Sequence, residues 1–371
     1  MRLSLVAILI CLLTTGCRPT DSTPELPHGK RVAVQFARGF IIEQIGDSYL
    51  VTVRDPLDTT HILATYRLKH DNKKGKDQIN IPVSRLVSFS TTHIGFLDVL
   101  GVQNTLVGFS GTTYICNDSV RKMVDEGKIV EVGNEGGIDH EKIVMLHPDI
   151  VMTYLTGNAA YDQVDKLYTL GLQPVINNEF MELSPLGQAE WIKFIAVFYD
   201  RLDEANAIFD KVMTEYIATS SLVGERGDRP TVFTGMAYKG EWTIPGGKSF
   251  AAGYIHDAGG KYLWESDSKT GNFPVSFETM LSIAGEAEIW LHPGASASSA
   301  EILAADERYA SFDALKTGHI FNNNARLCEG GGNDYWERGI VFPNEVLADL
   351  VAIFHPEVLK DHTFTFYTHL R

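Results

Sequence analysis

The chain has 371 residues, which is too long for one ordinary hydrophobic core and suits two α/β lobes. Its hydrophobic share of 44% is that of a soluble globular protein. The formal net charge of -15 argues against nucleic acid as a partner, because a protein that binds phosphates needs a basic surface.

The N-terminus predicts a signal for export. Met1 and Arg2 precede an apolar run over residues 3–13, and small residues then lead to Cys17. The run is shorter than the roughly 20 apolar residues that cross a bilayer. It resembles a bacterial lipoprotein signal, which implies removal of residues 1–16 and a lipid on Cys17. A plain signal peptide or an uncleaved anchor is the alternative.

The rest of the chain divides into segments that differ in composition and in the spacing of their apolar residues. Residues 17–37 are polar and Pro-rich, which predicts a flexible tether, and residues 38–81 predict a β extension that begins with a meander. Strands alternate with helices over residues 82–183 and again over 224–371, which predicts two lobes with mostly parallel sheets covered by helices. Residues 184–223 predict a helical linker, since residues 202–222 have apolar side chains at helical spacing.

Two segments of the chain resemble each other as an internal repeat. IDHEKIVMLHPDIVM, residues 138–152, matches VSFETMLSIAGEAEIWL, residues 275–291, with Asp139 and Ser276 as the expected helix N-caps. Glu141 and Glu278 then occupy equivalent positions in the first helical turn. The repeat predicts duplicated lobes with one of these acids on the cleft rim of each.

Cys116 and Cys328 fall in different halves of the chain. They could pair in an oxidising compartment, but a bond across a moving cleft would hinder its closure. We therefore expect two free or buried thiols.

Motifs of catalysis are missing from the sequence. The chain has no GxSxG, no HExxH, no P-loop and no GxGxxG that opens a helix. We expect a protein that is not an enzyme and has no resident cofactor or metal. Two alternatives stay open. One is an enzyme or cofactor-binding scaffold on the same two-lobed architecture, and the other is a free-metal receptor that uses His93, His140 and His292.

Ligands of open α/β sheets bind beyond the carboxyl ends of the strands. In both expected lobes the loops at that edge are rich in aromatic residues and poor in charge, which suits a large, partly apolar ligand. The candidate ligand-binding residues are Thr91, Tyr114, Tyr154, Trp242, Phe273 and Trp336.

The order of these segments resembles the substrate-binding proteins of ABC importers, and more narrowly the iron-siderophore and vitamin B12 periplasmic-binding family. The resemblance rests on RLVSFS, LDVLGVQNTLVGFS, VGNEGGIDHEKIVMLHPDIVM, a long helix, IPGGKSF and VSFETML, within residues 82–354. It implies two Rossmann-like lobes joined by one rigid helix, with the ligand held in a cleft between them. It also implies that an iron-siderophore, haem or cobalamin is captured in the periplasm or at the cell surface, by a lipid-anchored protein, and delivered to an ABC permease dimer.

The resemblance also implies roles for particular residues. In the B12-binding branch, cleft aromatics occur where this chain has Tyr154, Trp242 and Phe273. Catecholate siderophores usually meet basic side chains, for which the candidates here are Lys239, Arg326 and Arg338. In the family a pair of acids docks onto arginines of the two permease subunits, a role that falls here to Glu141 and Glu278.

Overall fold

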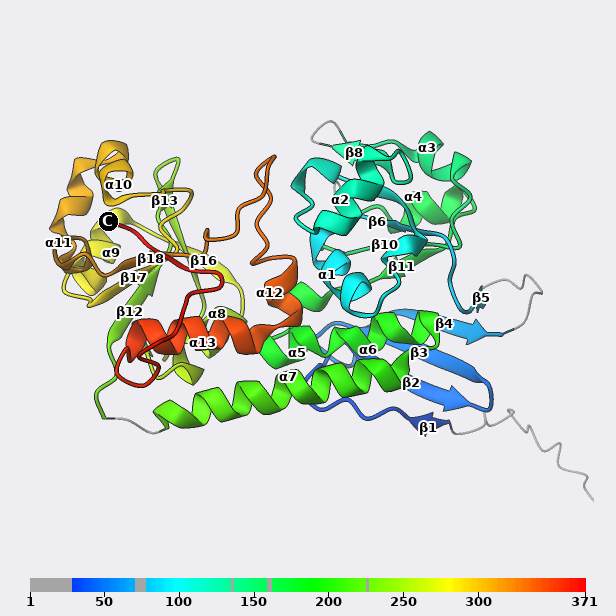
Figure 1. Cartoon of the computed structure of the whole chain (residues 1–371), viewed down its shortest axis with the longest axis horizontal. Helices are drawn as coiled ribbons and strands as arrows, with labels where there is room; N and C mark the ends of the chain where they lie inside the picture. Colours follow the sequence, from blue (N-terminus) through cyan, green and yellow to red (C-terminus); the bar gives the residue numbers. More distant parts are fainter. Residues whose placement is uncertain (1–28, 71–77, 135–136, 159–161, 225–226) are drawn as a thin grey trace, which may run out of the picture.

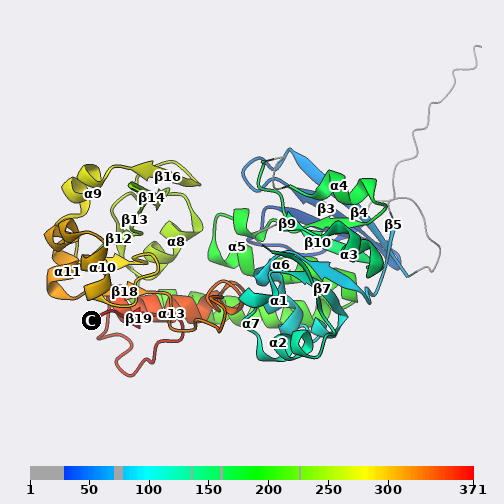
Figure 2. The same ribbon diagram turned by 90° about the horizontal axis from the view of Figure 1, so that it is seen from above.

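The structure, a computed structural model, describes residues 29–70, 78–134, 137–158, 162–224 and 227–371. Two α/β lobes stand side by side on a base of helices, and a further sheet lies at the base of the first lobe (Figure 1). Seen from above, the lobes lie side by side and the helices of the base run from one to the other (Figure 2). We call the lobes the N-lobe, built on strands β6 (Leu86–Ser88) to β11 (Pro174–Ile176), and the C-lobe, built on the sheet that contains β12 (Thr231–Thr234).

The first five strands form a sheet of their own: β1 (Lys30–Arg31), β2 (Phe40–Ile45), β3 (Ser48–Arg54), β4 (Ile62–Lys69) and β5 (Gln78–Asn80). Neighbouring strands are antiparallel except β4 and β5. This sheet packs on α6 (Trp191–Ala196), where the rings of Phe40 and Trp191 lie 5.0 Å apart. The predicted meander is confirmed, and its buried residues share one hydrophobic core with the N-lobe. The predicted tether extends too far: β1 lies within it, and Glu190 accepts from the backbone N–H groups of Phe36 and Ala37.

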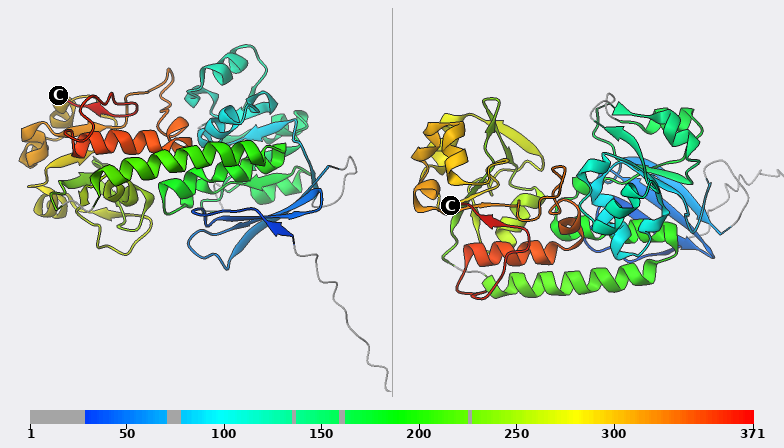
Figure 3. Two further views of the ribbon diagram at one scale, coloured as in Figure 1. Left: turned by 60° about the horizontal axis from the view of Figure 1, so that its bottom comes forward. Right: turned by 45° about the horizontal axis from the view of Figure 1, so that its top comes forward.

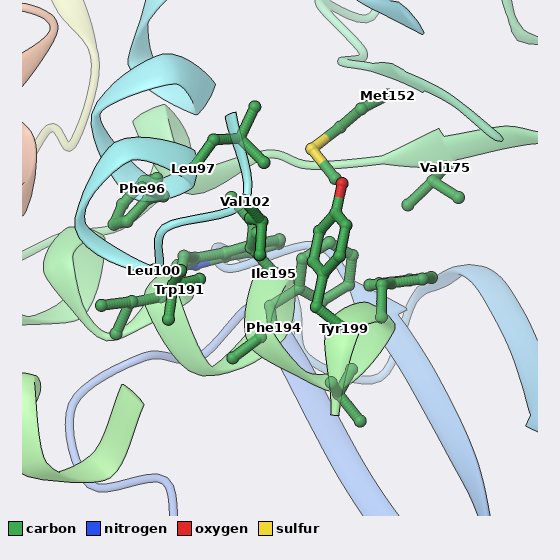
Figure 4. Close-up of a cluster of buried hydrophobic side chains, with 14 of the residues drawn as sticks. Phe96, Leu97, Leu100, Val102, Met152, Val175, Trp191, Phe194, Ile195 and Tyr199 are labelled. Carbon is green, nitrogen blue, oxygen red and sulfur yellow. The ribbon is translucent and has the colours of Figure 1, made fainter. Parts of the chain in front are cut away.

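The N-lobe is a six-stranded sheet in the order β11-β10-β6-β7-β8-β9, parallel except between β8 and β9. Its strands are β6 (Leu86–Ser88), β7 (Leu106–Ser110), β8 (Val130–Asn134), β9 (Gly137–Ile138), β10 (Ile150–Thr153) and β11 (Pro174–Ile176). They alternate with α1 (Thr91–Val99), α2 (Asp118–Asp125), α3 (His140–Met145) and α4 (Val164–Thr169). Figure 4 shows the core beneath the sheet, where apolar side chains of α1, β10, β11 and α6 meet.

The base of the molecule is helical. The long helix α7 (Leu202–Val223) covers the expected range, and its first turn contains Asp203 and Glu204, where the helix macrodipole favours negative charge. It runs beneath both lobes, with α13 (Pro343–Phe354) alongside (Figure 3). The short helix α5 (Pro185–Ala189) precedes α6 and begins with Ser184 as N-cap and Pro in its first turn.

The C-lobe sheet has the order β15-β12-β17-β18-β19 and is parallel except for β19. Its strands are β12 (Thr231–Thr234), β15 (Lys261–Tyr262), β17 (Ile289–Leu291), β18 (Ile320–Asn322) and β19 (Thr368–His369). A smaller antiparallel sheet consists of β13 (Ala237–Tyr238), β14 (Glu241–Pro245) and β16 (Asn272–Val275). The helices of this lobe are α8 (Phe250–Asp257), α9 (Phe277–Ala284), α10 (Ser299–Ala305) and α11 (Asp313–Thr317).

After β18 the chain extends from the C-lobe to the N-lobe and packs against both. We call residues 323–342 the strap; it appears in orange between the lobes in Figure 1 and contains α12 (Arg338–Val341), which packs on α1. The carboxylate of Glu337 accepts hydrogen bonds from the backbone N–H groups of Cys116 (2.9 Å) and Asn117 (2.7 Å). At Gly95 the two segments approach so closely that a Cβ would lie 2.3 Å from the Glu337 carbonyl oxygen.

The strap corrects the prediction of free thiols. Cys116 and Cys328 form a disulfide bond, with their Cα atoms 5.3 Å apart. The prediction placed Cys328 with the C-lobe, but the strap brings it beside Cys116 of the N-lobe. Because Tyr335 of the strap packs in the C-lobe core, the bond links the two lobes.

The expected fold is confirmed: two α/β lobes with mostly parallel sheets and one long helix beneath both. Within the described ranges, no helix is both long and apolar enough to traverse a bilayer. The predicted signal and Cys17 lie outside the described residues.

Candidate functional site

Two adjoining cavities open where the strands of the lobes end. The first, which we call the N-lobe cavity, has a volume of about 410 Å³ and is formed by residues that follow β6, β7, β10 and β11. Its lining combines aromatic rings with hydroxyl groups, among them Phe89, Thr91, Thr92, Tyr114, Tyr154 and Thr156.

The second, the interlobe cavity, has a volume of about 560 Å³. The C-lobe contributes Thr234, Phe250 and His292 to its wall, and the strap contributes Trp336 and Ile340. Three residues line both cavities: Thr92, Glu179 and Phe180. The two spaces therefore adjoin at these residues, in the position that the carboxyl ends of parallel strands favour for a ligand.

Four of the six candidate ligand-binding residues lie on these walls. Thr91 is in the first turn of α1, Tyr114 ends a 3₁₀ helix after β7, and Tyr154 directly follows β10; all three line the N-lobe cavity. Trp336, which is 43% exposed, lines the interlobe cavity. The Tyr154 ring meets Phe180 edge-on at 6.1 Å, so the structure brings an aromatic wall together at the junction of the cavities.

The other two candidates do not reach either cavity. Trp242 is fully buried among the rings of the C-lobe core, and its Nε1 donates to the carbonyl oxygen of Thr234 at 3.0 Å. Phe273 packs at the edge of the same core, with the Lys269 Nζ 4.2 Å from its ring centroid. The structure corrects the prediction that Trp242 contacts the ligand. Side chains alternate along β14, so Trp242 and Ile244 face the core and Thr243 lines the interlobe cavity.

A buried polar pair lies at the junction, and no motif in the sequence marks its acid, Glu179. Glu179 is 2% exposed, and its Oε1 accepts a hydrogen bond from the hydroxyl of Thr92. His93 is fully buried, with its Nδ1 2.8 Å from the hydroxyl oxygen of Ser88. The Glu179 Oε2 and the His93 Nε2 lie 3.9 Å apart, and neither has a hydrogen-bond partner.

Burial sets the charge of both groups. It raises the pKa of Glu179 from its ordinary 4.5 to about 7, although the hydrogen bond from Thr92 acts in the opposite direction. It lowers the pKa of His93 to about 3, so this imidazole is neutral near pH 7. Because His93 is neutral, it does not form an ion pair with Glu179.

The candidate basic residues lie away from the cavities. Arg326 bonds to Asp334, Arg338 bonds to Glu345 and stacks on Phe342, and Lys239 lies over the ring of Tyr238. The described residues that line the two cavities include no Lys and no Arg. The three basic side chains that the sequence suggested as partners of a catecholate siderophore therefore lie outside this site.

The three histidines considered for a free metal ion do not converge. His93 meets Ser88, the Nε2 of His140 lies 3.0 Å from the side-chain oxygen of Gln163, and the Nε2 of His292 lies 2.7 Å from the hydroxyl of Tyr367. In the part of the chain that the structure describes, no group of three or more His, Cys, Asp or Glu side chains could hold a metal ion.

The repeated acids occupy matching positions. Glu141 lies in the first turn of α3, which Asp139 caps, and Glu278 lies in the first turn of α9, which Ser276 caps. Both predicted N-caps are confirmed by hydrogen bonds of 3.1 Å to backbone N–H groups. Both acids are exposed, and Arg308 approaches Glu278 to 4.0 Å.

Comparison with known sequences gives the family. The family model for periplasmic binding proteins matches residues 86–327, which is more than half of the chain. The chain belongs to the periplasmic binding protein family. This family comprises siderophore, haem and B12 binding proteins, so the resemblance seen in the sequence is confirmed.

Individual matches agree with this assignment. An uncharacterised lipoprotein of Methanocaldococcus jannaschii is 28% identical over 298 residues, which are 78% of this chain and 69% of the relative. The fold is shared with an ABC transporter substrate-binding protein of Listeria monocytogenes (19% identity, TM-score 0.55, 74% of this chain and 99% of that one). It is also shared with a periplasmic haem-binding protein of Pseudomonas aeruginosa (17% identity, TM-score 0.56, 74% of this chain and 93% of that one). The protein is thus a periplasmic binding protein, and it shares its two-lobed fold with these substrate-binding proteins.

Proposed function

We propose that this periplasmic binding protein captures an iron chelate (a siderophore or haem) or cobalamin and delivers it to an ABC permease. The observation that carries the proposal is the pair of adjoining cavities, one in the N-lobe and one between the lobes, with aromatic and hydroxyl walls and volumes of about 410 and 560 Å³. Small-molecule sites in proteins typically measure about 300–1,000 Å³ and combine apolar walls with a few polar groups. The haem named for the Pseudomonas aeruginosa neighbour supports its inclusion among the candidate ligands.

Tyr154 is the aromatic residue best suited to test the proposal, because it lines the N-lobe cavity and touches Phe180 at the junction. Truncation of such an aromatic anchor commonly costs roughly 2 kcal/mol, so Tyr154→Ala should weaken ligand binding about thirtyfold. Isothermal titration calorimetry with a ferric hydroxamate, haem and cobalamin measures this loss.

The matched control is Tyr238→Ala, which removes the same side chain from an exposed position outside both cavities. It should leave the affinity unchanged. Equal affinities for the wild type and Tyr154→Ala, with both proteins folded, would remove Tyr154 from the site.

Two further parts of the proposal concern transport. We place the docking surface for the permease at Glu141 and Glu278, because both acids are exposed and begin equivalent helices of the two lobes. A receptor with this pseudo-twofold arrangement suits a partner made of two like subunits. We further propose that Cys17 bears a lipid that holds the protein at the outer side of a membrane, which the lipoprotein relative supports.

A further inference from the structure

The junction of the two cavities holds two polar atoms whose hydrogen-bonding capacity is unused. These are the Oε2 of Glu179 and the Nε2 of His93, both on side chains that are at least nine-tenths buried and both on the wall of the N-lobe cavity. A buried polar atom without a partner loses its hydrogen bonds to water and gains none in return, and proteins rarely carry such a cost without a reason.

A ligand can remove this cost. The two atoms are 3.9 Å apart, and hydrogen bonds span about 2.9 Å, so one ligand atom could bond to both once a small movement of the Glu179 side chain opens them to the cavity. A hydroxyl can accept from the imidazole N–H and donate to the carboxylate, and an ammonium can donate to both groups.

The charge of the walls restricts which ligands can enter. Among the described lining residues the cavities contain two carboxyl groups, Glu179 and Glu182, and no Lys or Arg. Glu182 is satisfied by the protein itself, since it accepts from the backbone N–H groups of Arg38 and Gly39 and from the Nε1 of Trp191. Only Glu179 of these two therefore has an oxygen left for a ligand, and a polyanion in this space has no lining cation to balance it.

We infer that the site selects an uncharged or positively charged ligand, and that Glu179 with His93 binds an N–H or O–H donor group of that ligand. This inference rests on the proposed function, and it narrows the class of chelate: a hydroxamate complex or a corrinoid fits these walls, and a catecholate complex with several negative charges does not.

Ionisation of Glu179 should then tune the affinity for a cation. The titratable acids and histidines that line the cavities with it are His93 on α1, Glu182 after the 3₁₀ helix of Glu179, and His292 after β17. Burial lowers the pKa of His93 to about 3 and that of His292 to about 4, so both stay neutral near pH 7, and burial raises the pKa of Glu182. A cationic ligand should thus bind more tightly as pH rises through about 7, where Glu179 ionises.

The test uses one chelate in three charge states: the ferric complex of desferrioxamine B, whose free amine is positive, and its acetylated (neutral) and succinylated (negative) derivatives. We expect the positive chelate to bind the wild type at least about tenfold more tightly than the negative one at about pH 8, and to lose about tenfold in affinity at about pH 6. Glu179→Gln keeps the hydrogen bond with Thr92 but cannot ionise, so it should lose both effects. Glu307→Gln removes the same charge from an exposed position outside the cavities and should keep both.

Equal affinities of the wild type for the three chelates would overturn the inference, as would an unchanged charge preference in Glu179→Gln. The pH dependence of the wild type tests it without any variant, and a flat profile for the positive chelate would also overturn it. If none of the three binds, cyanocobalamin (uncharged) and haem (with two anionic propionates) take their place. Tighter binding of cobalamin supports the inference and tighter binding of haem overturns it, whereas binding of no member of the panel overturns the proposed function itself.

Discussion

The disulfide between Cys116 and Cys328 leads to a prediction whose size follows from the structure. The bond closes a loop with a sequence separation of 212 residues, which the unfolded chain otherwise explores freely. The loop-entropy relation gives about 5 kcal/mol of stabilisation for a loop of this length at 25 °C. We expect the double variant Cys116→Ser with Cys328→Ser to lose up to this amount in free energy of unfolding.

The loss should appear as a lower melting temperature. With an unfolding entropy of roughly 2 cal/mol/K per residue, a loss of about 5 kcal/mol corresponds to about 7 °C for a chain of this size. The variant should still fold, because Glu337 continues to accept from the N–H groups of Cys116 and Asn117, and Arg121 continues to donate to the Glu329 carbonyl.

Differential scanning calorimetry of both proteins, without reductant, measures the difference. Peptide mapping without reductant should recover the Cys116 and Cys328 peptides as one linked pair from the wild type. Equal melting temperatures, or separate peptides with free thiols from the wild type, would refute the reasoning.

Three further predictions concern transport, anchoring and pH. Glu141→Ala with Glu278→Ala should abolish uptake of the ligand by cells, while the dissociation constant and melting temperature of the purified protein stay unchanged. Cys17→Ser should move the protein from the membrane fraction to the soluble fraction, because lipid chains supply about 0.8 kcal/mol of membrane affinity per buried methylene. Glu179→Gln should raise the free energy of unfolding by about 3 kcal/mol at about pH 8, and by nearly nothing at about pH 4, as urea denaturation can measure.

The sign of the last effect follows from the raised pKa. Between its ordinary 4.5 and about 7, Glu179 is ionised in the unfolded chain and protonated in the folded one. The folded state binds more protons in this window, so stability falls as pH rises through it, and a Gln at this position removes that loss. A stability difference between variant and wild type that is the same at both pH values would contradict the assignment.

The other two predictions also have decisive outcomes. Normal uptake by the double Glu variant would exclude the acids from docking, and a large loss of ligand affinity would place them in the binding site instead. If Cys17→Ser still sediments with membranes after a carbonate wash, the lipid is not the anchor.

The parts of the fold that the sequence predicted are those with local signals. The apolar period of α7 and the Asp139 and Ser276 caps depend on residues within a few positions of each other, and all are present in the structure. The position of Tyr154 on the cavity wall follows from its place directly after β10.

The features that the sequence did not predict depend on distant contacts or on register. The strap has no periodic pattern, and its disulfide joins residues 212 positions apart, so no local signal marks the pairing. The aromatic character of Trp242 suits a ligand site, whereas the alternation of side chains along β14 decides that it faces the core. Glu179 lies in a short 3₁₀ turn without a motif, and its raised pKa arises only from burial beside Thr92 and His93.

The central claim is that the adjoining cavities hold a metal chelate or corrinoid. The most direct measurement is a titration of the intrinsic tryptophan fluorescence with a ferric hydroxamate, haem and cobalamin, since Trp336 lies on the wall of the interlobe cavity. The account predicts a saturable change in emission with at least one of these ligands, complete at one ligand per protein molecule. A change that stays linear and unsaturated with all three would contradict it.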